Sequence, residues 1–99
     1  ERERKRQEAE ERQRRYARTK PLQDKIAVVE REIDKLEHEK SLLEQEMADP
    51  AFFKDGERAK AASARYKELE EKLPDRYFRW GTLNEELERL RDGSPGGER

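Results

Sequence analysis

The sequence contains no cysteine and a single histidine, His38. Without cysteine, the chain has no disulfide bond and no thiolate ligand for zinc. His38 falls on the side of its predicted helix that faces away from the apolar residues, and no second neutral ligand accompanies it. We therefore expect a solvated histidine and predict no metal site.

The sequence also lacks a long hydrophobic run. No segment approaches the roughly 20 apolar residues that a helix needs to cross a bilayer, and the charged first residues do not resemble a signal peptide. Hydrophobic residues make up 30% of the chain and charged residues 49%. This composition is too polar for a globular core. It predicts a soluble, cytoplasmic protein with no membrane partner.

A glycine-rich phosphate loop is missing as well. The five glycines stand alone or in one pair, and none belongs to the motif whose glycines and lysine cradle nucleotide phosphates. The carboxylates are interleaved with lysines and arginines at helical spacing, which indicates solvated ion pairs rather than a catalytic acid and base. The sequence therefore predicts no catalytic residue, no cofactor and no small-molecule substrate.

What the sequence does contain is a repeat of apolar residues at alternating steps of three and four. One series runs from Leu22 to Met47, and a second runs from Ala59 to Leu90. This spacing is typical of coiled coils, in which each helix buries a narrow seam against its partner. The two series therefore predict two long helices that pack against each other.

The chain is expected to reverse between the two series. Residues 49–56 include a proline, a glycine and two aspartates, which are residues that turns select. We therefore predict an all-α fold, an antiparallel two-stranded coiled-coil helical hairpin with helices over residues 21–48 and 57–91. Asp49 or Asp55 can cap the second helix with its carboxylate.

The pairing of the two series across this turn predicts which residues meet. With the turn centred near residue 53, Ile33 lies opposite Leu73. The same register, continued without interruption, places Ile26 opposite Trp80. We therefore expect the Trp80 ring to pack in the seam at the end away from the turn.

Polar and aromatic residues near the turn call for a local explanation. Lys40 occupies an apolar position of the first series, and the register places it opposite Tyr66, whose ring can cover its methylene stem. Phe52 and Phe53 adjoin the turn, where they either close the end of the seam or form an exposed docking patch. We favour the first of these two alternatives.

Two prolines interrupt the predicted helices. Pro21 marks a break or a capped restart at the beginning of the first seam helix. Pro74 lies inside the second helix, where the loss of a backbone hydrogen bond and a clash with the preceding turn cost about 3 kcal/mol. We therefore expect a kink or a short break near Leu73.

Charge is distributed unevenly along the chain, although its net value is only −1. Residues 1–20 carry nine basic and five acidic side chains, whereas residues 21–48 carry four basic and eight acidic ones. The first 20 residues favour a helix but offer few apolar side chains for burial. We predict a basic helical arm or linker over residues 1–20 and a flexible tail over residues 92–99.

The basic side chains are the candidate functional residues, because they neutralise phosphates and a nearby aromatic ring can stack on an exposed base. The predicted nucleic-acid-binding residues are Arg12, Arg14, Arg15, Tyr16, Arg18, Lys20, Lys54, Arg58, Lys60, Arg65 and Lys67. The alternative is a structural or protein-interaction hairpin. In that case the partner meets a hydrophobic tip made by Phe52, Phe53 and Leu42.

Short strings in the sequence carry a family resemblance. The predicted tip reads A-D-P-A-F-F over residues 48–53, and it is followed by Y-K-E-L-E at 66–70 and Y-F-R-W at 77–80. The entry to the first seam helix reads K-P-L at 20–22, after an arginine-rich arm. Together these strings resemble the C-terminal coiled-coil domain of ABC-F ATPases of the Uup type.

The resemblance implies a parent protein with two ATP-binding cassettes and no transmembrane domain, acting in the cytoplasm on ribosomes or nucleic acid. In the Uup branch, the C-terminal domain is associated with DNA binding. By this resemblance the chain is expected to be a non-catalytic accessory domain that contacts DNA or ribosomal RNA through basic residues. The ATPase cassettes of the parent chain are then its other partner.

Overall fold

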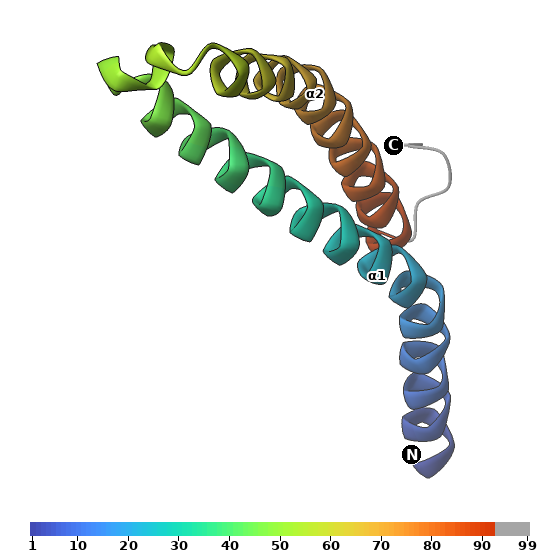
Figure 1. Cartoon of the computed structure of the whole chain (residues 1–99). Helices are drawn as coiled ribbons and strands as arrows, with labels where there is room; N and C mark the ends of the chain where they lie inside the picture. Colours follow the sequence, from blue (N-terminus) through green and yellow to red (C-terminus); the bar gives the residue numbers. More distant parts are fainter. Residues whose placement is uncertain (93–99) are drawn as a thin grey trace. The chain divides into compact units, whose positions relative to one another are not determined.

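A computed structural model describes residues 1–92 of the chain. The helix α1 spans Arg2–Met47, the short 3-10 helix η1 spans Pro50–Lys54, and α2 spans Gly56–Asp92 (Figure 1). Two long helices joined by a short turn make an all-α helical hairpin, which confirms the predicted fold class. Of the predicted flexible tail, residues 93–99 lie outside the described residues.

The chain divides into two compact units, and each of them contains part of both helices. The hairpin unit is Val29–Arg79, and it includes the turn. The terminal unit combines Glu1–Val28 with Trp80–Arg99, of which the structure describes the residues up to Asp92.

The core of the hairpin unit is the seam that the apolar repeat predicts. Its buried residues are Val29, Ile33, Phe52, Ala62, Leu69 and Leu73. Leu69 is completely buried, with 0% of its surface exposed. Lys40 is half-buried, and its ammonium nitrogen lies 5.7 Å from the centre of the Tyr66 ring. This cation–π contact confirms the predicted meeting of Lys40 with Tyr66.

The turn is held by two aspartates that each cap one helix. The Asp49 carboxylate accepts a hydrogen bond from the backbone N–H of Ala51 at 3.0 Å, at the beginning of η1. The Asp55 carboxylate accepts from the backbone N–H of Arg58 at 3.2 Å, at the beginning of α2. Each aspartate thus satisfies a backbone donor that has no partner within its helix.

The two phenylalanines of the turn have different environments. Phe52 is 3% exposed and closes the end of the seam, as predicted. Phe53 is 60% exposed, so the prediction that it also covers the seam is wrong. The two rings make an edge-to-face contact, with their centres 5.0 Å apart. The end of a seam between two helices is narrow, and one ring is enough to close it.

The terminal unit buries a second stretch of the seam. Its buried residues are Thr19, Leu22, Ile26, Leu83 and Leu87. Trp80 is 37% exposed, so the expectation that it packs within the seam is wrong. An indole is wide for a seam between two helices, and the smaller Leu83 and Leu87 are the residues of α2 that this unit buries.

Neither proline breaks its helix. α1 runs through Pro21, so the predicted break or restart there is wrong, and α2 likewise runs through Pro74 without the short break expected near Leu73. Buried leucines stand close to each proline, Leu22 after Pro21 and Leu73 before Pro74. Burial of such side chains contributes about 1.5 to 3 kcal/mol each, which offsets the cost of a proline in a helix.

Candidate functional site

Polar contacts between α1 and α2 line both sides of the seam in the hairpin unit. On one side, three arginines of α2 meet three glutamates of α1: Arg58 with Glu46 at 2.8 Å, Arg65 with Glu39 at 2.6 and 2.8 Å, and Arg76 with Glu32 at 3.4 Å. On the other side, two tyrosine hydroxyls of α2 donate to glutamates of α1: Tyr66 to Glu44 at 2.7 Å and Tyr77 to Glu37 at 2.6 Å. In all five contacts, α1 supplies the acceptor and α2 the donor.

The spacing of these contacts differs between the two helices. From Arg65 to Arg76 is eleven residues, yet their partners Glu39 and Glu32 are only seven apart. The two tyrosine contacts repeat the same difference. Both helices are continuous over this stretch, so the long arginine, tyrosine and glutamate side chains reach along the seam to span the difference of four residues, about 6 Å. The pairing of Ile33 with Leu73 stays a prediction.

These contacts change the acidity of the groups involved. The hydrogen bond to Glu44, with a smaller effect of burial, raises the pKa of Tyr66 to about 12. The bond to Glu37 raises the pKa of Tyr77 as well. The Arg65 guanidinium lowers the pKa of the Glu39 carboxyl. Each shift favours the protonation state that keeps the interhelical bond.

We predict that Tyr66→Phe removes a spectroscopic step from the alkaline titration of the chain. The phenol donates to Glu44 only while it is protonated. Because its pKa is raised in the fold, this stabilisation is complete below the ordinary tyrosine value of about 10 and is lost as the pH rises through about 12. Tyrosinate absorbance measured against pH should show a step near pH 12 in the wild type, and this step should be absent from Tyr66→Phe. An unchanged titration would contradict the contact.

The predicted basic residues of the arm lie in the terminal unit. Arg12, Arg14, Arg15 and Arg18 are exposed, and the described residues provide none of them with an ion pair or hydrogen bond. Tyr16, between them in sequence, is 59% exposed. Lys20 differs, because its ammonium group bonds to Asp24 at 2.6 Å and this bond raises its pKa.

The predicted basic residues of the hairpin unit fall into two groups. Lys54, Lys60 and Lys67 are exposed and have no ion pair among the described residues. Arg58 and Arg65 are bonded to glutamates of α1, so they hold the two helices together. The structure thus separates the cations that are available to a ligand from those that are already used within the fold.

A small pocket contains basic residues that the sequence did not single out. It has a volume of about 290 Å³ and lies beside the arginine contacts of the hairpin unit. Four of its lining residues are cations: Lys35, Arg65, Lys72 and Arg76. Lys35 and Lys72 lie beside apolar seam positions, and Arg76 occupies a position of the second series itself. That these cations line one pocket becomes apparent only when the two helices are paired antiparallel.

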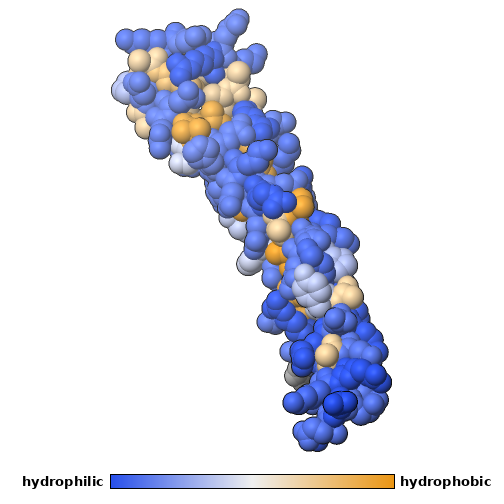
Figure 2. Space-filling view, turned by 90° about the horizontal axis from the view of Figure 1, so that it is seen from below, coloured by the Kyte–Doolittle hydropathy of each residue, from blue (hydrophilic) through white to orange (hydrophobic). Residues whose placement is uncertain are grey.

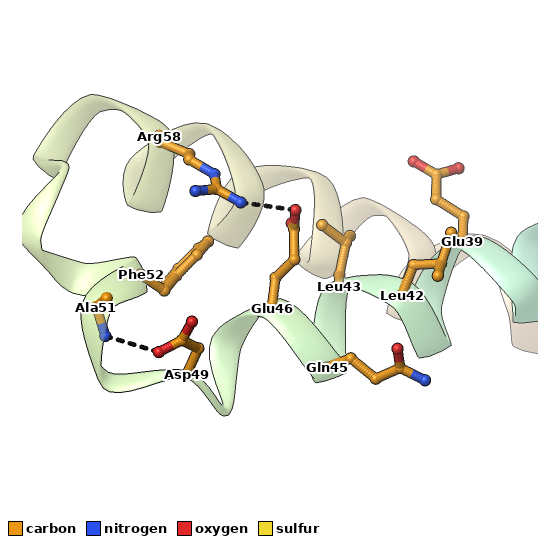
Figure 3. A pocket seen from close by; sticks show the side chains of 9 residues that line it. All are labelled: Glu39, Leu42, Leu43, Gln45, Glu46, Asp49, Ala51, Phe52 and Arg58. Atoms are coloured by element: carbon orange, nitrogen blue, oxygen red, sulfur yellow. Dashed lines mark hydrogen bonds and ion pairs between the residues drawn. The ribbon is translucent and has the colours of Figure 1, made fainter.

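A larger pocket opens at the tip of the hairpin unit, and we call it the tip pocket. It has a volume of about 550 Å³ and its lining residues come from α1, the turn and the first turn of α2 (Figure 3). They are Glu39, Leu42, Leu43, Gln45, Glu46, Asp49, Ala51, Phe52 and Arg58. Figure 3 shows Arg58 reaching across to Glu46 above the Phe52 ring. The apolar residue Leu42, predicted at the tip, is 48% exposed.

The face of the molecule seen in Figure 2 is largely polar. Figure 2 shows hydrophilic residues over most of the visible face, with hydrophobic ones in small separate patches. Phe78, for which the sequence predicts no functional role, is 76% exposed. Among residues 1–92 there is no group of three or more potential metal ligands, and His38 is exposed. No helix in this range has an apolar stretch long enough to span a membrane.

Comparison with known proteins identifies the family. The family model for the ABC transporter C-terminal domain matches residues 17–85, which is more than half of the chain. The searches of curated proteins and of solved structures gave no significant match. The matched family is one of accessory, non-catalytic domains, in keeping with an all-helical hairpin. The chain therefore belongs to the ABC transporter C-terminal domain family.

Proposed function

We propose that this accessory domain binds nucleic acid through basic side chains, in the cytoplasm, as part of an ABC-F protein of the Uup type. The observation that carries the proposal is the set of four arginines in the arm. Arg12, Arg14, Arg15 and Arg18 are exposed within two turns of α1, and the described chain supplies no carboxylate partner for them. Charged groups left without a partner in the fold are available to phosphates.

The helical geometry of the arm selects three of these arginines as one cluster. Arg18 follows Arg14 by four residues and Arg15 by three, and residues at these spacings are neighbours on a helix surface. We call Arg14, Arg15 and Arg18 the arm triplet. Tyr16 lies one turn after Arg12, and its exposed ring is suited to stacking on an unpaired base.

Association with ATP-binding cassettes is the second part of the proposal. It rests on the family match and on the strings that resemble ABC-F proteins. Walker and ABC signature motifs in the protein sequence preceding this domain would support it. Transmembrane segments fused to the same cassette would contradict the ABC-F assignment.

We predict that Arg14→Gln/Arg15→Gln/Arg18→Gln weakens binding to duplex DNA about a hundredfold near physiological salt. The reason is counterion release, since each phosphate contact contributes about −0.9 to the slope of log affinity against log salt. Three lost contacts should make that slope shallower by about 2.7. Fluorescence anisotropy across a salt series measures both quantities, with duplex DNA, single strands and structured RNA as separate ligands.

Two variants with the same change in net charge serve as controls. Lys25→Gln/Arg31→Gln/Arg79→Gln removes three exposed cations outside the predicted site and should leave the affinity within a few-fold of the wild type. Lys54→Gln/Lys60→Gln/Lys67→Gln tests the predicted cations of the hairpin unit. Equal losses in all three variants would mean that only net charge matters, and the arm would have no specific role. The preferred ligand decides between DNA and RNA.

A further inference from the structure

The tip pocket has the opposite charge character to the arm. Three carboxylates line it, from Glu39, Glu46 and Asp49, and its one cation is Arg58. Arg58 donates to Glu46 at 2.8 Å, and Arg65 donates to Glu39 at 2.6 and 2.8 Å. Asp49 has no ion pair among the described residues, so the lining keeps an excess of one negative charge, which repels phosphates and favours a cation.

The pocket also offers apolar surface between its charges. Leu42, Leu43, Ala51 and Phe52 contribute to its lining, and Leu42 is 48% exposed. Leu42 lies on the exposed part of α1, so it contributes little to the seam. A ligand that covered it would remove apolar surface from water at no cost to the fold.

Arg58 illustrates the kind of group that suits this pocket. Its guanidinium lies 5.5 Å from the centre of the Phe52 ring while it donates to Glu46. A carboxylate can accept up to about four hydrogen bonds, so Glu46 and Asp49 retain acceptor capacity beyond the bonds described. A second cation can therefore bind at the rim without displacing Arg58.

We propose that the tip pocket binds a basic amphipathic segment of another protein, with an aliphatic side chain against Leu42 and Phe52 and a lysine or arginine at the carboxylate rim. The volume of about 550 Å³ is that of a site for several side chains rather than for a single ion. The proposal goes beyond nucleic-acid binding and does not depend on it, because the ligand has the opposite charge and the residues are different.

The test uses the whole chain, labelled for NMR, and a synthetic helical peptide. The peptide carries leucine and lysine four residues apart on one face, and a control peptide has glutamate in place of lysine. Addition of the basic peptide should shift the resonances of the residues that line the pocket. The acidic peptide should leave them unchanged.

Gln45 allows the charge of the rim to be changed in both directions. It lines the pocket, is exposed, and makes no hydrogen bond among those of the described residues. Glutamine, glutamate and lysine have similar helix propensities, so the fold should not change. Gln45→Glu should tighten peptide binding about two- to fivefold and Gln45→Lys should weaken it by a similar factor, the range for one exposed charge pair.

Leu42 and Val28 form a matched pair for the apolar contact. They are 48% and 49% exposed, and both lie on α1, but only Leu42 lines the pocket. Leu42→Lys should weaken peptide binding at least about tenfold, since it buries a charge where an apolar side chain docks. Val28→Lys makes the same chemical change elsewhere and should have no effect.

Three results would overturn the proposal. The first is the absence of shifts at the pocket with the basic peptide at about 1 mM, the concentration at which even weak specific binding is detected. The second is an equal response of Leu42→Lys and Val28→Lys. The third is concentration-dependent self-association that Leu42→Lys abolishes, which would assign the pocket to a second copy of the chain. The arm-triplet variant, by contrast, should lose affinity for DNA and keep its affinity for the peptide.

Discussion

Leu69→Ala is expected to lower the free energy of unfolding by about 2 to 5 kcal/mol, in the upper half of that range. Among residues 1–92, Leu69 is the one core residue with 0% of its surface exposed, and it belongs to the seam of the hairpin unit. Truncation removes buried methyl groups and leaves a cavity that two long helices cannot easily close. A single seam supplies most of the stability, so the loss should also lower the melting temperature clearly.

Leu42→Ala is the matched control for this substitution. It makes the same chemical change on a helix, but Leu42 is 48% exposed and does not belong to the buried core. Its effect should be within about 0.5 kcal/mol. Urea unfolding followed by circular dichroism measures both. Similar losses in the two variants would mean that stability comes from helix propensity rather than from the seam.

Phe52→Ala is expected to cost about 3 to 4 kcal/mol, whereas Phe53→Ala should cost about 1 kcal/mol. The two residues are neighbours in sequence and are chemically identical, but Phe52 is 3% exposed and Phe53 is 60% exposed. Phe52 also lies under the Arg58 guanidinium. Phe53 contributes mainly through its edge-to-face contact with Phe52, which is lost in either variant.

Thermal and urea unfolding of the two variants test this difference. If Phe53→Ala proved as damaging as Phe52→Ala, both rings would be needed to close the seam, as the sequence first indicated. If both changes were mild, the turn would contribute little to stability. The tip pocket should lose peptide binding in Phe52→Ala, since that ring is part of its lining.

The apolar repeat predicts the fold because it is a property of each helix by itself. Leu22, Ile26, Val29 and Ile33 are spaced for one face of a helix, and all four are buried. Register is harder, because it depends on how two helices meet. The sequence alone does not indicate that Arg65 meets Glu39 and that Arg76 meets Glu32, because long side chains reach along the seam to partners that are not directly opposite.

The prolines show a second limit of reasoning from the sequence. A proline has a known local cost, but whether a helix ends there depends on what the flanking residues bury. Leu22 and Leu73, each beside a proline, are buried. The local rule alone predicted a break or restart at Pro21 and a kink or short break near Leu73, whereas both helices continue through their prolines.

The sequence predicts which residues of the candidate site are basic, but it does not predict which of them are already bonded within the fold. The sequence identifies basic clusters, yet it treats Arg15 and Arg65 alike. In the structure, Arg15 has no partner among the described residues, while Arg65 is bonded to Glu39 and Glu68. Which cation is available depends on the carboxylate that faces it across the hairpin, and this is a consequence of the register.

Because α2 supplies the donors and α1 the acceptors of the five interhelical contacts, two copies of the same helix are poorly matched to each other. In the hairpin unit, α1 presents glutamates along both edges of its seam, and α2 presents arginines on one edge and tyrosines on the other. Two α1 segments placed face to face would bring carboxylates together, and two α2 segments would bring guanidiniums together, and both arrangements are repulsive. A chain emerging from the ribosome is thereby discouraged from pairing with the same segment of its neighbour, and it is directed to fold back on itself.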